Sequence, residues 1–274
     1  MKKSVLVTGS TDGIGKQTAL QLAKLGFRVI VHGRNREKSE KAAFEIKKLS
    51  GNNSVDYVYA DFTSQTQIYT MAVQIFKQYE SLDVLINNAG VYINRRNLTE
   101  DGLETTFAVN HMAPFIVTNL LLPLLKKSEE ARIVTVSSMI HAGSIEFDNL
   151  QGEKYFDGGY AYSLSKLCNV LFTYKIAREI ESFNITAKCL HPGVINTKLL
   201  RAGWGGMGAP ASSGAETSVF LASSADIIGV TGKYFANEKA SKSKPITYAP
   251  ETQDKLWEIS EKLWRTPHEV LSQL

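Results

Sequence analysis

The chain has 274 residues, of which 43% are hydrophobic and 21% charged, and its formal net charge is +4. These values are ordinary for a globular protein with room for one large α/β domain. The basic residues are scattered, and their densest cluster, at 238–244, is short and contains an acid. We therefore expect this cluster to be a solvated loop, and we expect no nucleic-acid partner.

Targeting, membrane and metal-binding segments are not expected either. The apolar start at 5–7 is far shorter than the core of a signal peptide, and Asp12 follows soon after it. The most apolar stretch, 115–125, is too short to span a bilayer and reads as a buried helix. The cysteines Cys168 and Cys189 have no metal-ligand spacing and no evident disulfide pairing. We expect a cytoplasmic protein without a metal site or a transmembrane segment.

Apolar strands alternate with helical patterns along the chain. We predict strands over 4–8, 27–33, 55–61, 82–88, 131–138 and 185–193. Helices are predicted from the end of the first glycine-rich turn to about 25, then over 35–50, 64–79, 100–126 and 160–181, and a last helix over 250–264. Such alternation is typical of a parallel sheet that is covered on both faces. The sequence therefore predicts a single α/β domain over 1–274.

The first predicted strand ends in a glycine-rich turn, TGSTDGIG, at 8–15. Gly9, Gly13 and Gly15 permit tight turns and a close backbone approach, and the following helix directs its first N–H groups at an anion. The spacing differs from both GxGxxG and the P-loop. Because the turn follows the first strand of an alternating chain, we predict that it binds the pyrophosphate of a dinucleotide.

The segment YAYSLSK at 160–166 offers a tyrosine–lysine pair. At about 100° per residue, Tyr162 and Lys166 share one face of a helix, whereas Tyr160 points elsewhere. An ammonium beside a phenol favours the phenolate, so we expect Lys166 to lower the pKa of Tyr162 from its usual value of about 10. The same spacing is common on amphipathic helices, so other motifs in the chain must decide whether this pair is catalytic.

The GxxxGxG spacing, together with Tyr162 and Lys166, resembles the short-chain dehydrogenase/reductase family. Further motifs follow in the order of that family: NNAG at 87–90, VNH at 109–111, VSS at 136–138 and PGVINT at 192–197. The match runs from about residue 4 to about residue 235. The insertion between Ser138 and Tyr162 looks like the retinol dehydrogenase and carbonyl reductase branch. The resemblance implies a single Rossmann-like, doubly wound parallel sheet with helices on both faces.

The resemblance also implies a catalytic set of Asn110, Ser138, Tyr162 and Lys166. Ser138 and Tyr162 would hydrogen-bond the reacting oxygen, and Tyr162 would exchange the proton. Lys166 would hold the nicotinamide ribose, and Asn110 would anchor a water that resupplies the proton. Side chains alternate across a strand, so Ser137 faces away from Ser138 and is expected to serve backbone and cofactor contacts.

The cofactor-binding residues that we expect come from the matched motifs and from the end of the second strand. They are Thr8, Gly9, Ser10, Asp12, Gly13, Ile14, Gly15, Arg34, Asp61, Phe62, Asn88, Ala89, Gly90, Tyr162, Lys166, Pro192, Gly193, Val194 and Thr197. Asp61 matches the acid that usually meets the adenine, although a strand-end cap would explain it equally well. Asn88 is also expected to hydrogen-bond the neighbouring backbone.

The stretch 196–212 is expected to form a mobile lid over the nicotinamide end. Its glycines are permissive, and Leu199, Leu200, Trp204 and Met207 can cover an apolar substrate. A merely irregular surface loop is the alternative. His141 follows Ser138 closely and is expected to line the cleft. The expected substrate residues are His141, Trp204 and Met207.

The cofactor prediction depends on the end of the second strand, which reads His32, Gly33, Arg34. NAD-selective proteins usually carry an acid there, which accepts the ribose hydroxyls. Arg34 offers a charged fork suited to a 2′-phosphate, and Gly33 leaves room where an acidic side chain would stand. An Arg34 that only stacks on adenine is the alternative. We predict NADP(H) as the cofactor.

The sequence as a whole predicts an NADP(H)-dependent oxidoreductase. It would transfer a hydride between nicotinamide and a small, partly apolar carbonyl compound or its primary or secondary alcohol. A catalytically silent nucleotide-sensing protein on the same fold, or a sugar-nucleotide epimerase or dehydratase, are the alternatives. A homo-oligomer is compatible with these features.

Overall fold

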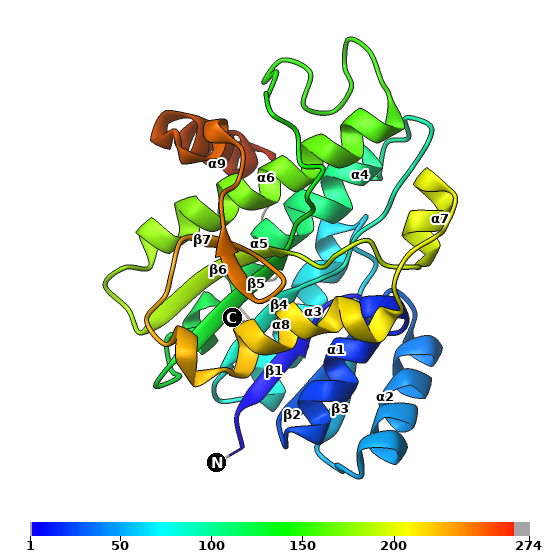
Figure 1. Ribbon diagram of the computed structural model, residues 1–274, viewed down its shortest axis with the longest axis vertical. Helices are drawn as coiled ribbons and strands as arrows, with labels where there is room; N and C mark the ends of the chain where they lie inside the picture. Colours follow the sequence, from blue (N-terminus) through cyan, green and yellow to red (C-terminus); the bar gives the residue numbers. More distant parts are fainter. Residues whose placement is uncertain (1, 266–274) are drawn as a thin grey trace.

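An eight-stranded sheet forms the centre of the computed structural model, which describes residues 2–265 (Figure 1). The strand order is β3-β2-β1-β4-β5-β6-β7-β8. The strands are β1 (Ser4–Val7), β2 (Arg28–Gly33), β3 (Val55–Tyr59), β4 (Val84–Asn87), β5 (Ala131–Val136), β6 (Ile185–His191), β7 (Lys233–Ala236) and β8 (Lys239–Ser241). The first seven pair in parallel, and β8 runs antiparallel to β7. The predicted doubly wound α/β fold is confirmed.

Helices cover both faces of the sheet (Figure 1). They are α1 (Gly13–Lys24), α2 (Arg36–Ser50), α3 (Gln65–Gln78), α4 (Thr105–Phe107), α5 (Ala113–Leu125), α6 (Gly158–Glu179), α7 (Lys198–Trp204), α8 (Ala211–Ser223) and α9 (Pro250–Leu263). Helices α1, α2 and α8 lie on one face, whereas α3, α5 and α6 lie on the other, with α9 packed against α6. The last predicted helix, 250–264, is therefore present as α9.

The side chains of the buried strands pack into two large hydrophobic cores, one on each face of the sheet, and into a small third cluster. In β1, Leu6 packs into the core beneath α3, α5 and α6, whereas Val5 and Val7 pack into the core beneath α1 and α8. A strand covered on both faces reads as a continuous apolar run, because its side chains alternate between the two faces. Burying each such side chain contributes about 1.5–3 kcal/mol.

The apolar helix in the middle of the chain lies within the range 100–126 that was predicted for it. Residues Thr105–Leu125 run continuously through α4, a π-helical turn at Ala108–Met112, and α5. By length and composition alone this helix could cross a membrane, but 83% of its apolar window is buried inside the protein. The apolar stretch 115–125 is the last part of this longer helix, and its prediction as a buried helix is confirmed.

Two further differences concern the C-terminal part of the sheet. Strands β7 and β8 were not predicted, and β8 lies inside the 238–244 cluster that was expected to be a loop. This short edge strand is exposed at all three positions and begins with Lys239, so its sequence resembles a solvated loop. The strand order reverses between β1 and β4, and ligands of open α/β sheets bind in the crevice at such a point.

Candidate active site

The glycine-rich turn packs so tightly against the NNAG loop that side chains would not fit. A Cβ atom on Gly9 would lie 2.8 Å from the Cα of Ala89, and one on Gly15 would lie 2.4 Å from the Nδ2 of Asn88. Asn88 Nδ2 donates to the carbonyl oxygens of Thr8 (2.8 Å) and Gly9 (3.2 Å). The predicted structural role of Asn88 is therefore confirmed, and it fixes the turn that a dinucleotide would contact.

Thr8 and Ser10 belong to the framework of this turn and do not line its groove. The Thr8 hydroxyl accepts hydrogen bonds from the backbone N–H groups of Asn88 and Ala89. The Ser10 hydroxyl donates to the Val7 carbonyl (2.7 Å) and accepts from the backbone N–H of His32. Both side chains are buried, so the structure does not place them where a cofactor could touch them.

His32 ties the turn to the neighbouring strand ends. Its Nδ1 accepts the Gly9 N–H at 3.1 Å, and its Nε2 donates to the Ala60 carbonyl at 3.2 Å. The ring also stacks on Phe62, with centroids 4.3 Å apart. Burial lowers the pKa of His32 to about 4, so the ring is neutral and can hold both bonds. This role of His32 was not predicted, because only the short contact between its Nδ1 and the Gly9 N–H reveals it.

A groove runs from this turn along the carboxyl edge of the sheet. Asp12 caps the start of α1 by accepting the Gly13 N–H at 2.8 Å. Most of the expected cofactor residues line the groove: Gly9, Asp12, Gly13, Ile14, Gly15, Arg34, Asp61, Phe62, Asn88, Ala89, Gly90 and Thr197. Asp61 accepts from the N–H and hydroxyl of Thr63 and lies 4.0 Å from Arg34, so it serves as a turn cap at the edge of the groove. The groove therefore passes the glycine-rich turn, the end of β2 and the NNAG loop, which are the segments expected to bind a dinucleotide.

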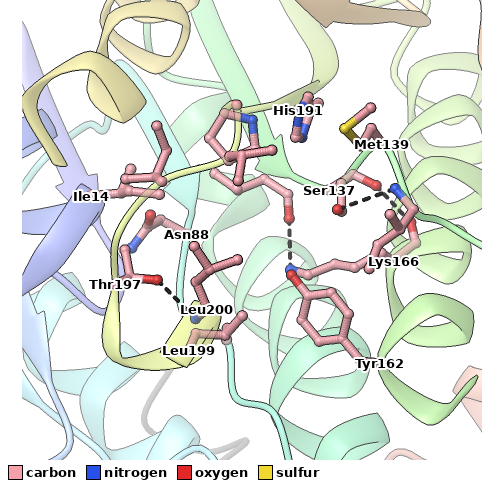
Figure 2. A pocket seen from close by; sticks show the side chains of 18 of the residues that line it. Ile14, Asn88, Ser137, Met139, Tyr162, Lys166, His191, Thr197, Leu199 and Leu200 are labelled. Atoms are coloured by element: carbon pink, nitrogen blue, oxygen red, sulfur yellow. Dashed lines mark hydrogen bonds between the residues drawn. The ribbon is translucent and has the colours of Figure 1, made fainter. Parts of the chain in front are cut away.

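The groove continues into a cavity of about 320 Å³ that is lined by three of the four predicted catalytic residues, Asn110 being buried outside it (Figure 2). Ser138, Tyr162 and Lys166 line it together with Pro192, Gly193 and Val194 of the last matched motif. Tyr162 is hydrogen-bonded to Ser138. The Lys166 ammonium lies 5.6 Å from the Tyr162 ring centroid, as the shared helix face predicted.

The expected lowering of the Tyr162 pKa does not occur in this structure. Burial raises the pKa of Tyr162 to about 12, and the hydrogen bond from Ser138 only partly opposes it. Burial likewise lowers the pKa of Lys166 to about 8, and its Nζ donates to the Val136 carbonyl at 3.0 Å. Both shifts have one cause, because a dry cavity penalises the charged form of either group.

Ser137 and Ser138 both line the cavity just beyond the end of β5, so they do not face opposite ways as expected, but the predicted backbone contact of Ser137 is present. The Ser137 hydroxyl donates to the Lys166 carbonyl at 2.7 Å and so ties α6 to the end of β5. The Ser138 hydroxyl instead lies beside Tyr162 at the cavity.

Asn110 lies in the π-helical turn and is fully buried. Its Oδ1 accepts the Val91 N–H at 2.8 Å, and its Nδ2 donates to the Val91 carbonyl and to the Ser165 hydroxyl, both at 3.0 Å. A Cβ atom on Gly90 would lie 3.4 Å from Asn110 and 3.5 Å from the Lys166 ammonium, so the two groups flank the same point. The side chain positions α6 and the NNAG loop, and its link to a water stays a prediction.

Aromatic rings close one side of the cavity. The Trp204 ring lies 5.3 Å from Tyr162 and 4.9 Å from Tyr92, and Tyr92 lies 6.0 Å from Tyr162. The remaining apolar wall comes from α7 and the segment after β5: Met139, Ile140, Leu199 and Leu200. The sequence analysis overlooked Tyr92, although it lies two residues beyond the NNAG motif. Trp204 is therefore placed where the sequence predicted it.

His141 and Met207 do not take the predicted positions at the cavity. His141 is buried, where its Nδ1 donates to the Ser138 carbonyl at 2.7 Å and its Nε2 accepts the Lys244 N–H at 3.1 Å. It therefore fastens the catalytic serine to the segment after β8. Met207 is 91% exposed and lies outside the cavity wall, because it follows the end of α7.

His191 lines the cavity, although it was not among the predicted site residues. Its Nδ1 is buried without a hydrogen-bond partner among residues 2–265. Burial and the neighbouring His141 lower its pKa, so the ring is neutral. Its position directly before the Pro-Gly motif was the available signal.

Comparison with known proteins agrees with this geometry. The family model described as short chain dehydrogenase matches residues 3–204. Human retinol dehydrogenase 14 is 38% identical, with 94% of this chain and 85% of that protein covered, and human polyprenol dehydrogenase is 40% identical, with 93% and 83% covered.

Solved structures agree as well. A putative uncharacterized protein from Mycobacterium paratuberculosis is 29% identical, with a TM-score of 0.80 over 95% of this chain and 92% of that one. A putative short chain dehydrogenase from Escherichia coli CFT073, complexed with NADPH, is 25% identical, with a TM-score of 0.71 over 86% and 97%. The chain therefore belongs to the short chain dehydrogenase family, in its retinol dehydrogenase-like branch.

Proposed function

We propose that the protein is an NADP(H)-dependent oxidoreductase that reduces a partly apolar carbonyl compound and can oxidise the corresponding alcohol. The observation that carries this proposal is the meeting of Ser138, Tyr162 and Lys166 in one cavity at the end of a groove lined by most of the expected cofactor-binding residues. A bound dihydronicotinamide would supply the hydride.

The side chains suit the charge that develops on the substrate oxygen. Ser138 and Tyr162 would donate hydrogen bonds to that oxygen, and Tyr162 would pass its proton to it. With a pKa of about 12 the phenol is protonated at neutral pH, which favours its action as a proton donor and hence the reductive direction. Lys166 would hold the cofactor ribose beside it.

The wall of the cavity supports an apolar substrate. Met139, Ile140, Leu199, Leu200 and Trp204 surround the catalytic hydroxyls with apolar surface. The similarity to proteins named for retinol and for polyprenol is in keeping with an alcohol of apolar character.

The end of β2 supports a preference for NADP(H). A Cβ atom on Gly33 would lie 2.3 Å from the Thr11 methyl group, so Thr11 fills the room that we expected to be open, and no acidic side chain fits there. A polar cavity beside it is rich in basic side chains, four of which come from α1, from the end of β2 and from α2: Lys16, Arg34, Lys38 and Lys41. Two of its acids are already paired, Glu45 with Lys16 and Asp12 with Lys198. The excess of positive charge favours a 2′-phosphate.

Fluorescence titration of the purified protein with NADPH and with NADH tests the cofactor assignment. Charge-assisted phosphate contacts predict that NADPH binds about ten- to a hundredfold more tightly. Arg34→Ala should remove most of this preference and leave the NADH dissociation constant little changed. Arg36→Ala is the matched control, because Arg36 bonds to Tyr57 and lines a different cavity. Equal wild-type dissociation constants would contradict the assignment.

A panel of aldehydes, ketones and quinones with NADPH tests the activity itself. Oxidation of NADPH by any of them would exclude a protein that only senses nucleotides, and products that need no net redox change would instead favour an epimerase or dehydratase. We also propose a cytoplasmic location. The two cysteines, Cys168 and Cys189, support it because both are buried as free thiols that form no disulfide.

A further inference from the structure

The start of α7 lies directly against the glycine-rich turn. Thr197 caps α7, because its hydroxyl accepts the Leu200 N–H at 3.2 Å. A Cβ atom on Gly13 would lie 3.7 Å from the Thr197 methyl group. Lys198 and Leu199 line the dinucleotide groove from this side. The segment that builds the substrate wall thus begins at the phosphate end of the groove.

An ion pair links the start of α7 to the start of α1. The Lys198 Nζ lies 2.6 Å from Asp12 Oδ2, while Asp12 Oδ1 accepts the Gly13 N–H that starts α1. The hydrogen bond from Lys198 is the main cause that lowers the pKa of Asp12, so the carboxylate is charged at neutral pH. The two side chains are 83% and 61% exposed, so the pair is not required to fill a core.

The negative charge of Asp12 opposes the binding of a dinucleotide pyrophosphate in the groove. The N-terminus of a helix attracts a pyrophosphate through its free N–H groups and its dipole. A carboxylate at the same helix end repels that pyrophosphate. Lys198 is the cation that offsets this carboxylate, and it lies on the wall of both the groove and the adjoining basic cavity.

We propose that Lys198 is a cofactor-binding residue that closes over the dinucleotide phosphates from α7. Its ammonium neutralises Asp12 and adds positive charge at the pyrophosphate. This inference rests on the dinucleotide binding proposed above. Because α7 also carries Leu199, Leu200 and Trp204, the contact that holds the phosphates holds the substrate wall in place as well.

Dissociation constants for NADPH and NADH in a set of variants test this role. Lys198→Met should raise both constants alike, by about three- to tenfold, and should make binding less sensitive to salt. Asp12→Asn keeps a helix-capping side chain and removes the charge, so its binding should be unchanged or tighter. In the double variant both charges are gone, and binding should return to within about twofold of wild type.

Lys154→Met is the matched control, because Lys154 forms an exposed ion pair with Asp148 and lines neither the groove nor the catalytic cavity. Its constants should equal those of wild type, and all variants should share one unfolding curve. Unchanged constants in Lys198→Met would overturn the proposal. So would a loss confined to NADPH, which would assign Lys198 to the 2′-phosphate, or a double variant no tighter than Lys198→Met. A failure of carbonyl turnover would instead refute the oxidoreductase assignment and leave this binding comparison intact.

Discussion

The catalytic lysine should lower the stability of the protein that contains it. Lys166 is only 3% exposed, and burial lowers its pKa to about 8. In the unfolded chain a lysine has a pKa of about 10.4. The folded protein therefore holds this proton less tightly than the unfolded chain does, and the free energy of unfolding increases as the pH rises through this range.

The size of the effect follows from the two pKa values. One pKa unit corresponds to about 1.36 kcal/mol, so the buried ammonium costs about 3 kcal/mol at pH 7. Lys166→Met removes this cost but loses the hydrogen bond to the Val136 carbonyl, worth about 1 kcal/mol. That carbonyl still accepts a hydrogen bond from Asn169 Nδ2, so it is not left unpaired. We expect the cofactor-free variant to be about 1–2 kcal/mol more stable than wild type at pH 7.

Urea unfolding of the cofactor-free proteins at pH 7, 8, 9 and 10 measures the difference in free energy of unfolding between Lys166→Met and wild type. The other titrating groups are common to both proteins, so their contributions cancel. The advantage of Lys166→Met should shrink as the pH rises from about 8 towards 10, because in this range the folded wild-type protein loses the Lys166 proton while the unfolded chain still keeps it, so the buried charge disappears. Lys175→Met is a control of opposite sign: burial alone would lower the pKa of Lys175, but Glu179 and Asp254 raise it, so this variant should be destabilised at pH 7. A Lys166→Met protein that is less stable than wild type, or a difference that ignores pH, would refute the reasoning.

Three further outcomes follow from the cavity. Tyr162→Phe should reduce carbonyl turnover by at least about a hundredfold with little change in cofactor affinity, since it removes the proton donor, whereas Tyr160→Phe should be mild in the same assay. Trp204→Ala should raise the KM of bulky apolar substrates several-fold, whereas the exposed Met207→Ala should leave it unchanged, and equal effects would contradict the wall described here. Amide exchange in 196–212 should slow when cofactor and substrate bind, and exchange that ignores both would argue against a lid.

The order of the elements could be predicted from the sequence because it depends on local patterns. Apolar runs separated by helical periods marked the first six strands and the main helices to within a few residues. Strands β7 and β8 were not predicted, because neither shows the long apolar run of a buried strand. Both are short, and all residues of β8 are exposed. The π-helical turn at Ala108–Met112 also has no signature in residue spacing.

The catalytic residues could be predicted for a similar reason, since motif and spacing locate them without knowledge of the fold. What the sequence could not supply is the surroundings of each side chain. The pKa of Tyr162 rises because the fold buries its side chain, to which Tyr92 and Trp204, distant in sequence, contribute ring contacts. His141 was predicted to contact substrate because it is near Ser138 in the chain. Its Nε2 instead accepts a hydrogen bond from the backbone N–H of Lys244.

The site divides into a fixed part and a part that can move. Ser137 bonds α6 to β5, and Asn110 bonds α6 to the NNAG loop, so the hydroxyls and the ammonium are held by hydrogen bonds between rigid elements. The apolar wall instead depends on α7, a helix with no buried residue, which is joined to the groove chiefly by Thr197 and the exposed pair of Lys198 with Asp12. Substitutions that loosen α6 should therefore slow the reaction of every substrate alike. Substitutions in α7 should alter which substrate is accepted, because only there can the wall shift without displacing the proton donor.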